Sequence, residues 1–280
     1  MPELPEAETI ARQLAAQAVA RIVRKVTVRS PRAVRSHRSR AEFARLVEGR
    51  RIAAVGRRGK AVLLFLNGKG PATLIVRLGM SGQLRLSPSR RKLEDHARAI
   101  LQLSGGCQLR FIDPRQFGLL VARNGAAVDQ LPEFWGYGPE PLSPEFTPTS
   151  LRRALARRSA RLGVALMDQR LVAGIGKIYA DEACFRAGLA PARPANSLAE
   201  GDCRRLWSAV RRVLRAAIRL QGTSSADEAY LDSYGNRGRF RERLMVYQRT
   251  GQPCRVCGTR IKRQRLTGGR GLHWCPRCQE

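Results

Sequence analysis

The sequence predicts an α+β fold, with a β-rich first half, a helical second half and a cysteine-rich module at the end. Three observations support this. Short apolar runs separated by turn residues continue to residue 122, helical periodicity begins after residue 149, and two Cys-x-x-Cys pairs lie beyond residue 250. Many short strands without helices between them are typical of an antiparallel sandwich or barrel. We therefore expect an N-terminal antiparallel β-sandwich domain.

The first element is predicted to be a helix over residues 5–20, because Ile10, Leu14 and Ala18 recur at helical spacing. A proline suits the first helical position, and glutamates in the first turn favour the positive end of the helix dipole. Glu6 fits that explanation, whereas Glu3 precedes the helix and is not explained by it.

Strands are expected next, with turn dipeptides such as Asn67-Gly68 and Gly105-Gly106 between some of them. The expected strands cover residues 26–28, 51–55, 61–66, 72–78, 97–103, 107–112 and 117–122. Five prolines between Pro132 and Pro148 then indicate an interdomain hinge or a long surface loop.

The second half is expected to contain helices at 150–158, 164–169, 177–187 and 199–221. Residues 222–243 are rich in Gly, Ser and Arg and are expected to form a flexible loop. The resulting division is a β-sandwich domain at 1–134, a hinge at 135–149, a helical domain at 150–243 and a cysteine-rich module at 244–280.

The charge balance indicates a polyanionic partner. The chain has 52 Lys and Arg against 22 Asp and Glu, which gives a formal net charge of +30. Nucleic acid is the leading candidate and an acidic membrane surface the alternative. An apolar run of about 18 residues that could span a bilayer is not present, and the start of the chain does not resemble a secretion signal. We expect a soluble cytoplasmic protein that does not bind membranes.

Four cysteines have the spacing of a zinc site: Cys254, Cys257, Cys275 and Cys278. Two such pairs can complete a tetrahedron of thiolates around one Zn²⁺, while the alternative of two disulfides is disfavoured in a reducing compartment. Four cysteine ligands leave no open position, so the metal is expected to be structural. Cys107, Cys184 and Cys203 are expected to be buried free thiols.

The N-terminus offers a nucleophile. Methionine before proline is commonly removed, which would leave Pro2 with a free secondary amine. An α-amino group is a better neutral nucleophile near pH 7 than a lysine, and a secondary amine that attacks a sugar C1′ forms a cationic iminium. Glu3 lies beside it as a possible proton donor. The alternative is an ordinary polar start in which Pro5 opens a helix.

Several motifs give the chain a resemblance to the bacterial formamidopyrimidine-DNA glycosylase and endonuclease VIII family. They are MPELPEAET at 1–9, RGK at 58–60, LGMSG at 78–82, DPRQFG at 113–118, DQ at 168–169, AGIGKIYADE at 173–182 and GRGLHWCPRCQ at 269–279. The resemblance implies a β-sandwich, a helical domain with a helix–two-turn–helix motif and a terminal zinc-finger β-hairpin, with DNA across the cleft between the domains. Leu4 matches the formamidopyrimidine branch.

The resemblance also implies a function. The expected activity is a bifunctional DNA glycosylase and abasic-site lyase of base excision repair, which removes oxidised purines such as 8-oxoguanine and then cleaves by β,δ-elimination. The expected partner is duplex DNA with oxidised bases or abasic sites, bound by a monomer at the bacterial nucleoid. Two alternatives remain open: an endonuclease VIII-like enzyme for oxidised pyrimidines, and a non-catalytic binder of damaged DNA.

The family motifs imply roles for individual residues. Pro2 would be the nucleophile, Glu3 would transfer protons, and Glu6 would support both. Lys60 would contact a phosphate or the leaving base, and Arg270 the phosphates that flank the lesion. Without the motifs, Lys60 would count as one more surface lysine.

Three further residues match the family's void-filling set: Met80, Arg115 and Phe117. The set fills the space left by a flipped nucleotide. Without the motif, Met80 and Phe117 would be assigned to the core. Thr223 and Tyr234 are candidates from the 222–243 loop, which in the formamidopyrimidine branch closes over the flipped base.

Two DNA-binding candidates depart from the family. Lys177 follows a glycine turn at a helix start, where backbone N–H groups bind phosphate, but the family usually has Asn there. Arg77 stands where the family often has His. Both changes add positive charge, which strengthens nonspecific binding more than lesion recognition.

Overall fold

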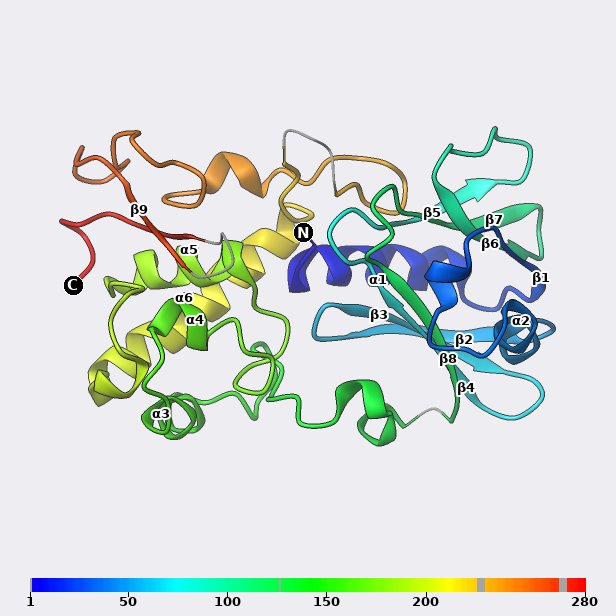
Figure 1. Cartoon of the computed structure of the whole chain (residues 1–280), viewed down its shortest axis with the longest axis horizontal. Coiled ribbons are helices and arrows are strands. Elements are labelled where there is room, and N and C mark those ends of the chain that lie inside the picture. The colour runs from blue at the N-terminus through cyan, green and yellow to red at the C-terminus, as the bar shows by residue number, and fades with distance from the viewer. Residues whose placement is uncertain (1, 126, 226–229, 267–270) are drawn as a thin grey trace. The chain divides into compact units, whose positions relative to one another are not determined.

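The structure is a computed structural model that describes residues 2–125, 127–225, 230–266 and 271–280 (Figure 1). Its contacts divide the chain into two compact units. The first combines Met1–Trp135 with Ile218–Arg241, and the second combines Gly136–Ala217 with Glu242–Glu280. The chain therefore leaves the first unit, builds part of the second, and returns to the first before it ends in the second.

The first unit contains two four-stranded antiparallel sheets. One has the order β1-β6-β7-β5, with β1 at Val23–Val28, β6 at Ala97–Leu103, β7 at Cys107–Ile112 and β5 at Gln83–Pro88. The other has the order β2-β3-β4-β8, with β2 at Arg51–Arg58, β3 at Ala61–Asn67, β4 at Ala72–Arg77 and β8 at Leu119–Asn124. Buried side chains from both sheets, including Leu64, Val76, Leu101 and Phe111, share one apolar core, which confirms the predicted sandwich.

Helix α1 covers Leu4–Ala18 and contacts β2 and β3. Its side chains Ile10, Leu14 and Ala18 are fully buried in the same core, as their spacing predicts. The structure adds three elements that the sequence pattern did not reveal: strand β5, helix α2 at Arg40–Val47 and the 3-10 helix η1 at Pro31–Val34. The α2 helix begins where the Ser39 side chain accepts a hydrogen bond from the N–H of Glu42, and it buries Phe43.

The second unit contains α3 at Pro148–Ala156, α4 at Leu162–Ala165, α5 at Lys177–Ala187 and most of α6 at Glu200–Arg219. The predicted helices at 150–158, 177–187 and 199–221 are confirmed within about two residues at each end. The predicted helix at 164–169 is wrong in extent, because α4 is a single turn that ends at Ala165. Short 3-10 helices also occur at Val128–Gln130 and Pro132–Phe134 in the first unit, at Ala195–Ser197 in the second unit, and at Phe240–Arg243 across their boundary.

The last part of the second unit is a β-hairpin of β9 at Lys262–Arg265 and β10 at Gly271–Trp274. Helix α5 anchors the segment that leads to it. The buried carboxylate of Glu182 accepts hydrogen bonds from the backbone N–H groups of Met245, Val246 and Tyr247 at 2.9–3.0 Å. Among the described residues, none of the helices combines the length and apolarity needed to cross a membrane.

Candidate functional site

The start of α1 holds the proposed nucleophile and proton donor in a buried position. Pro2 is buried, and Glu3, which is the N-cap residue, has only 1% of its surface exposed. The backbone N–H of Glu3 donates to Oε2 of Glu6 at 2.7 Å. The Glu6 carboxylate thus satisfies a backbone donor at the helix start that no intrahelical acceptor could reach.

The other oxygen of Glu6 reaches a distant part of the chain. Its Oε1 accepts a hydrogen bond from the backbone N–H of Thr223 at 2.7 Å, and both residues are buried. Gly222 makes this approach possible. Its φ is +83°, and a Cβ atom there would lie 2.7 Å from Glu6 Oε1. The structure therefore brings Thr223 to the same helical turn as Pro2 and Glu3.

The described parts of the 222–243 segment, which was predicted to be a flexible loop, form specific hydrogen bonds with α1. The side-chain oxygen of Gln13 on α1 accepts hydrogen bonds from the N–H and hydroxyl of Ser233, and its amide donates to Asp232 at 2.9 Å. Asp232 Oδ1 in turn accepts the N–H of Tyr234 at 3.0 Å. Tyr234 is 40% exposed. It therefore lies on a segment anchored to α1 through Gln13 and Asp232, two residues that sequence reasoning missed.

Tyr230 is a buried residue of the same segment and makes a hydrogen bond to the residue that precedes the segment. Its phenol donates to the carbonyl of Gln221 at 3.1 Å and only 2% of the residue is exposed. Burial, assisted by the nearby carboxylates of Glu6 and Asp232, raises the pKa of Tyr230 well above its ordinary value. The phenol stays a neutral donor throughout the physiological range.

Lys60 lies in the two-residue turn between β2 and β3 and is half-buried. Gly59 supplies the left-handed conformation of this turn with φ +57°. Arg57 links the turn to α1: it donates to Gly59 O at 2.8 Å and to Glu8 Oε2 at 2.9 Å. The helix that follows Pro2 is thus tied to the turn that carries Lys60.

Glu8 is well suited to hold this link. Burial raises the pKa of its carboxyl, but hydrogen bonds from Arg12 and Arg57, together with their charges, outweigh it and hold that pKa below the usual range. The carboxylate therefore remains ionised at neutral pH and keeps its ion pair with Arg57.

The void-filling residues lie on two connections, not on strands. Met80 follows β4 and is 39% exposed, while Phe117 precedes β8 and is 50% exposed. The predicted strand 117–122 is wrong at its start, since β8 begins at Leu119. The Arg115 guanidinium lies over the Phe117 ring, 5.2 Å from its centroid. Their exposure disfavours the core assignment of Met80 and Phe117.

A buried carboxylate joins these two connections. Asp113 is fully buried, and it accepts the hydroxyl of Ser81 at 2.7 Å and the N–H of Gly118 at 2.7 Å. The backbones also approach closely, because a Cβ on Gly79 would lie 2.7 Å from Gly118 N. Asp113 is part of the motif at 113–118, but the sequence analysis gave it no role. The signal that could have identified it is its position in the same motif as Arg115 and Phe117.

Arg77, at the end of β4, is half-buried. Its guanidinium donates to the carbonyl of Glu133 at 2.6 Å and lies 5.9 Å from the centroid of the Phe134 ring. These contacts fix the direction of the side chain and do not neutralise its charge.

In the second unit, Lys177 begins α5, as its glycine turn predicts. Its ammonium forms an ion pair with Asp181 and lies 5.8 Å from the centroid of the Tyr247 ring. Asp181 is fully buried and its Oδ2 also contacts Nδ1 of His273 on β10 at 2.8 Å. Lys177 is therefore an ion-paired cation, and its partner Asp181 also contacts the hairpin through His273. Arg270 lies outside the described residues.

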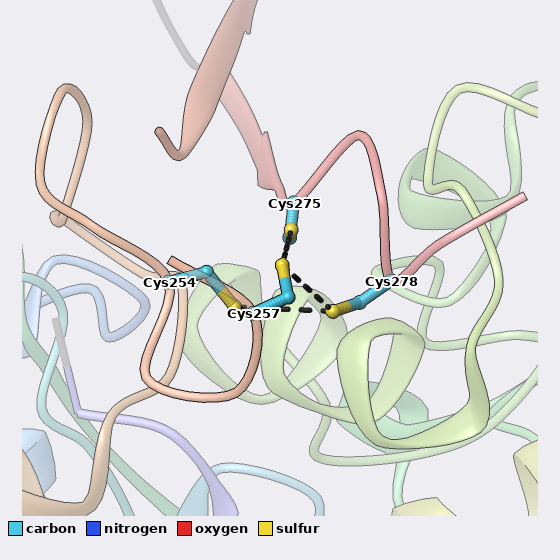
Figure 2. Close-up of side chains that lie close together, drawn as sticks. All are labelled: Cys254, Cys257, Cys275 and Cys278. Atoms are coloured by element: carbon cyan, nitrogen blue, oxygen red, sulfur yellow. Dashed lines mark hydrogen bonds between the residues drawn. The ribbon is translucent and has the colours of Figure 1, made fainter. Parts of the chain in front are cut away.

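The four predicted zinc ligands converge (Figure 2). Cys254 and Cys257 come from one loop and Cys275 and Cys278 from the segment after β10, and all four Sγ atoms lie within 4.8 Å of one another. Three of the Sγ–Sγ distances are 3.4–3.9 Å, which is too long for a disulfide. A Zn–S bond of about 2.3 Å requires about 3.8 Å between sulfurs of a tetrahedron. The donor set thus fits one structural Zn²⁺.

Of the remaining cysteines, Cys184 and Cys203 are buried as predicted, whereas Cys107 is only half-buried.

Three family models match the chain. The formamidopyrimidine-DNA glycosylase N-terminal domain matches residues 1–120, the formamidopyrimidine-DNA glycosylase H2TH domain matches 137–229, and the zinc finger found in FPG and IleRS matches 251–280. Among curated proteins, formamidopyrimidine-DNA glycosylases from Heliobacterium modesticaldum and Thermus thermophilus are 42% and 43% identical. The first alignment covers 100% of both chains, and the second covers 100% of this chain and 98% of the relative.

Solved structures agree. The crystal structure of the MutM (Fpg) protein from Thermus thermophilus has a TM-score of 0.88 at 42% identity, covering 99% of this chain and 98% of that one. A complex of a Lactococcus lactis Fpg variant with DNA containing Fapy-dG has a TM-score of 0.89 at 31% identity, covering 100% of both chains. A Lactococcus lactis Fpg complex with DNA containing an abasic site has a TM-score of 0.88 at 31% identity, covering 99% of both chains.

Proposed function

The chain belongs to the formamidopyrimidine-DNA glycosylase family, and from this membership we infer that it is a DNA glycosylase and abasic-site lyase of base excision repair that acts on oxidised purines. Its partner is DNA that contains damaged bases or abasic sites, as in the complexes of its structural neighbours. We place this activity in the bacterial cytoplasm at the nucleoid, since the relatives are bacterial. The division at 134, 149 and 243 is kept as a proposal, with the zinc finger held by one structural metal.

One observation carries the assignment of the reacting group: the Pro2-Glu3 start is buried and is held by the Glu6 carboxylate. In the proposed reaction, the Pro2 nitrogen attacks C1′ of the damaged nucleotide. The bond from C1′ to the base breaks, and the base leaves with the electron pair and takes up the proton that the amine releases. Glu3 donates a proton to the sugar ring oxygen, so the ring opens and a C1′ iminium forms.

The lyase steps use the iminium as an electron sink. Loss of the C2′ proton drives β-elimination, and the 3′ phosphate departs with the electron pair of its C–O bond. A second proton loss drives δ-elimination of the 5′ phosphate. Hydrolysis of the remaining iminium restores the Pro2 amine.

The other candidates are proposed to contact DNA. Lys60 would meet a phosphate or the leaving base, with Arg77 and the segment of Thr223 and Tyr234 on the same unit. Met80, Arg115 and Phe117 would fill the space of the flipped nucleotide. On the second unit, Lys177 would act as a donor held by Asp181, and Arg270 would meet the flanking phosphates.

Borohydride trapping tests the Pro2 assignment. Wild-type protein with a duplex that contains 8-oxoguanine opposite cytosine should give a covalent protein–DNA adduct when sodium borohydride reduces the iminium. Pro2→Gly should lose the adduct, while Phe117→Ala should still form it on a preformed abasic site. Equal adduct from Pro2→Gly, or retained Met1 in fully active protein by mass spectrometry, would refute the assignment. Faster excision of thymine glycol than of 8-oxoguanine would favour the oxidised-pyrimidine branch.

A further inference from the structure

Arginines gather at one edge of the first unit, where the mechanism above does not use them. Between Glu8 and Glu42 the sequence has nine Lys and Arg residues and no Asp or Glu. The structure places four of them around a hollow of about 290 Å³ that runs from η1 to the start of α2. These four residues, called the arginine edge below, are Arg32, Arg35, Arg38 and Arg40.

The charge of the arginine edge is not neutralised. All four residues are exposed, and none forms an ion pair with any residue that the structure describes. Their side-chain hydrogen bonds go to neutral carbonyls, such as that from Arg35 to Arg32 O at 2.8 Å. The nearby carboxylate of Glu42 accepts the backbone N–H of Arg38 at 2.6 Å.

The other titratable group of the hollow, His37, adds no charge. Its Nε2 accepts the backbone N–H of Ala122 at 3.1 Å, which requires the neutral ring. Burial, assisted by Arg123, lowers the pKa of His37 and favours the same neutral form. The edge therefore carries several cations against one carboxylate.

Arg35 links the arginine edge to the loop between β7 and β8. Its guanidinium donates to Gly118 O at 2.8 Å and to Phe117 O at 3.3 Å. Arg35 thus links the arginine edge to the backbone of the exposed Phe117. If Phe117 enters the duplex at the lesion, as the proposed function holds, the arginine edge borders the DNA backbone next to that point.

We propose that Arg32, Arg38 and Arg40 form a second phosphate-binding surface that holds the DNA backbone beside the lesion. Guanidinium groups match phosphate oxygens in geometry and stay charged at every physiological pH. Contacts of this kind release counterions and read no bases, so they raise affinity equally for damaged and undamaged DNA. Arg35 belongs to the arginine edge but is not among the three proposed phosphate contacts, because its guanidinium donates to the Phe117 carbonyl.

The test removes two of these charges in the full-length protein, as Arg32→Gln with Arg38→Gln. Fluorescence anisotropy would measure the Kd for a duplex with an abasic-site analogue and for its undamaged counterpart at several salt concentrations. The slope of log K against log salt should become shallower by about 1.8, or about 0.9 for each lost phosphate contact. Both duplexes should weaken by the same factor.

A matched control removes the same charge elsewhere, as Arg90→Gln with Lys92→Gln. Both residues are exposed on the connection that follows β5, at the other edge of the sheet from β1. The control should keep the wild-type slope. An unchanged slope in the Arg32 and Arg38 variant, or an equal change in both variants, would overturn the proposal.

A nicking assay keeps this inference separate from the proposed function on which it rests. At saturating enzyme, wild type and the Arg90→Gln with Lys92→Gln control should cleave a preformed abasic site at the same single-turnover rate. A wild type that does not cleave would refute the lyase assignment. Cleavage with no difference in salt slope would refute the arginine edge alone.

Discussion

The Glu6 carboxylate accepts the backbone N–H of Thr223 at 2.7 Å, although the two residues are 217 positions apart in the chain. The same carboxylate accepts the N–H of Glu3 through its other oxygen. One buried side chain thus sets the position of the helix start that carries the proposed nucleophile and of the segment after α6. This arrangement predicts that Glu6 matters to the reaction without taking part in it.

Glu6→Gln tests this prediction. The amide would turn an NH₂ group toward one of two backbone donors, leaving a buried N–H without an acceptor at a cost of about 1–3 kcal/mol in the free energy of unfolding. Excision and cleavage of a preformed abasic site should both slow, because the Pro2 position is disturbed. Glu200→Gln, on a carboxylate whose side chain is 55% exposed, should match wild type in denaturant unfolding and in rate. Wild-type rates in Glu6→Gln would contradict the positioning role.

Phe117→Ala should lower lesion search and excision while leaving stability nearly intact, because half of the residue is already exposed. Phe111→Ala provides the comparison. Phe111 is 1% exposed in the core, so its truncation should cost about 3–5 kcal/mol. Thermal unfolding and single-turnover excision of 8-oxoguanine would separate the two effects. A fall in thermal stability for Phe117→Ala comparable to that of Phe111→Ala would identify it as a core residue.

Lys177→Asn, which restores the residue usual in the family, should change the salt slope of DNA binding by well under the roughly 0.9 expected for a free cation at a phosphate. The reason is the ion pair with Asp181, which already compensates the ammonium. Asp181→Asn should have the opposite effect and steepen the slope, since it releases the lysine charge. Anisotropy at several salt concentrations measures both. If the salt slope for Lys177→Asn became shallower by about 0.9, the ion pair between Lys177 and Asp181 would have to open when DNA binds.

Zinc removal should unfold the hairpin and leave the first unit folded, because the four thiolates join only residues of the second unit. Purified protein should contain one zinc per chain by elemental analysis, and Cys257→Ser should lower that content. Hydrogen exchange should then speed up in β9 and β10 but not in β3 or β4. Full zinc content in Cys257→Ser, or equal loss of protection in both units, would contradict a local structural metal.

The sequence predicted the parts of the fold that depend on neighbouring residues. The bounds of α5 were predictable because glycine stands at each end, Gly176 as the N-cap and Gly188 with φ +72° as the C-cap. The zinc ligands were predictable because two cysteine pairs can be recognised from spacing alone. In contrast, α2 has only eight residues, and its arginine-rich approach carries no helical pattern.

The sequence did not predict the contacts that assemble the candidate site. Asp113 acts through Ser81, and Asp181 acts through His273, 92 residues away. Such pairs form only after tertiary folding, and a single sequence contains no trace of them. The motif placed Phe117 among the void-filling residues, but periodicity assigned it to a strand. Only the structure shows that β8 begins two residues later.

The interrupted path of the chain through the first unit affects how the enzyme is made. A nascent polypeptide that has reached Trp135 on the ribosome contains Pro2 and the residues of both sheets, but not Thr223, the partner of Glu6, or Ser233, the partner of Gln13. Those residues emerge only after most of the second unit has been translated. The support for the proposed nucleophile is therefore completed late in synthesis, and an early fragment of the chain lacks the partners of Glu6 and Gln13.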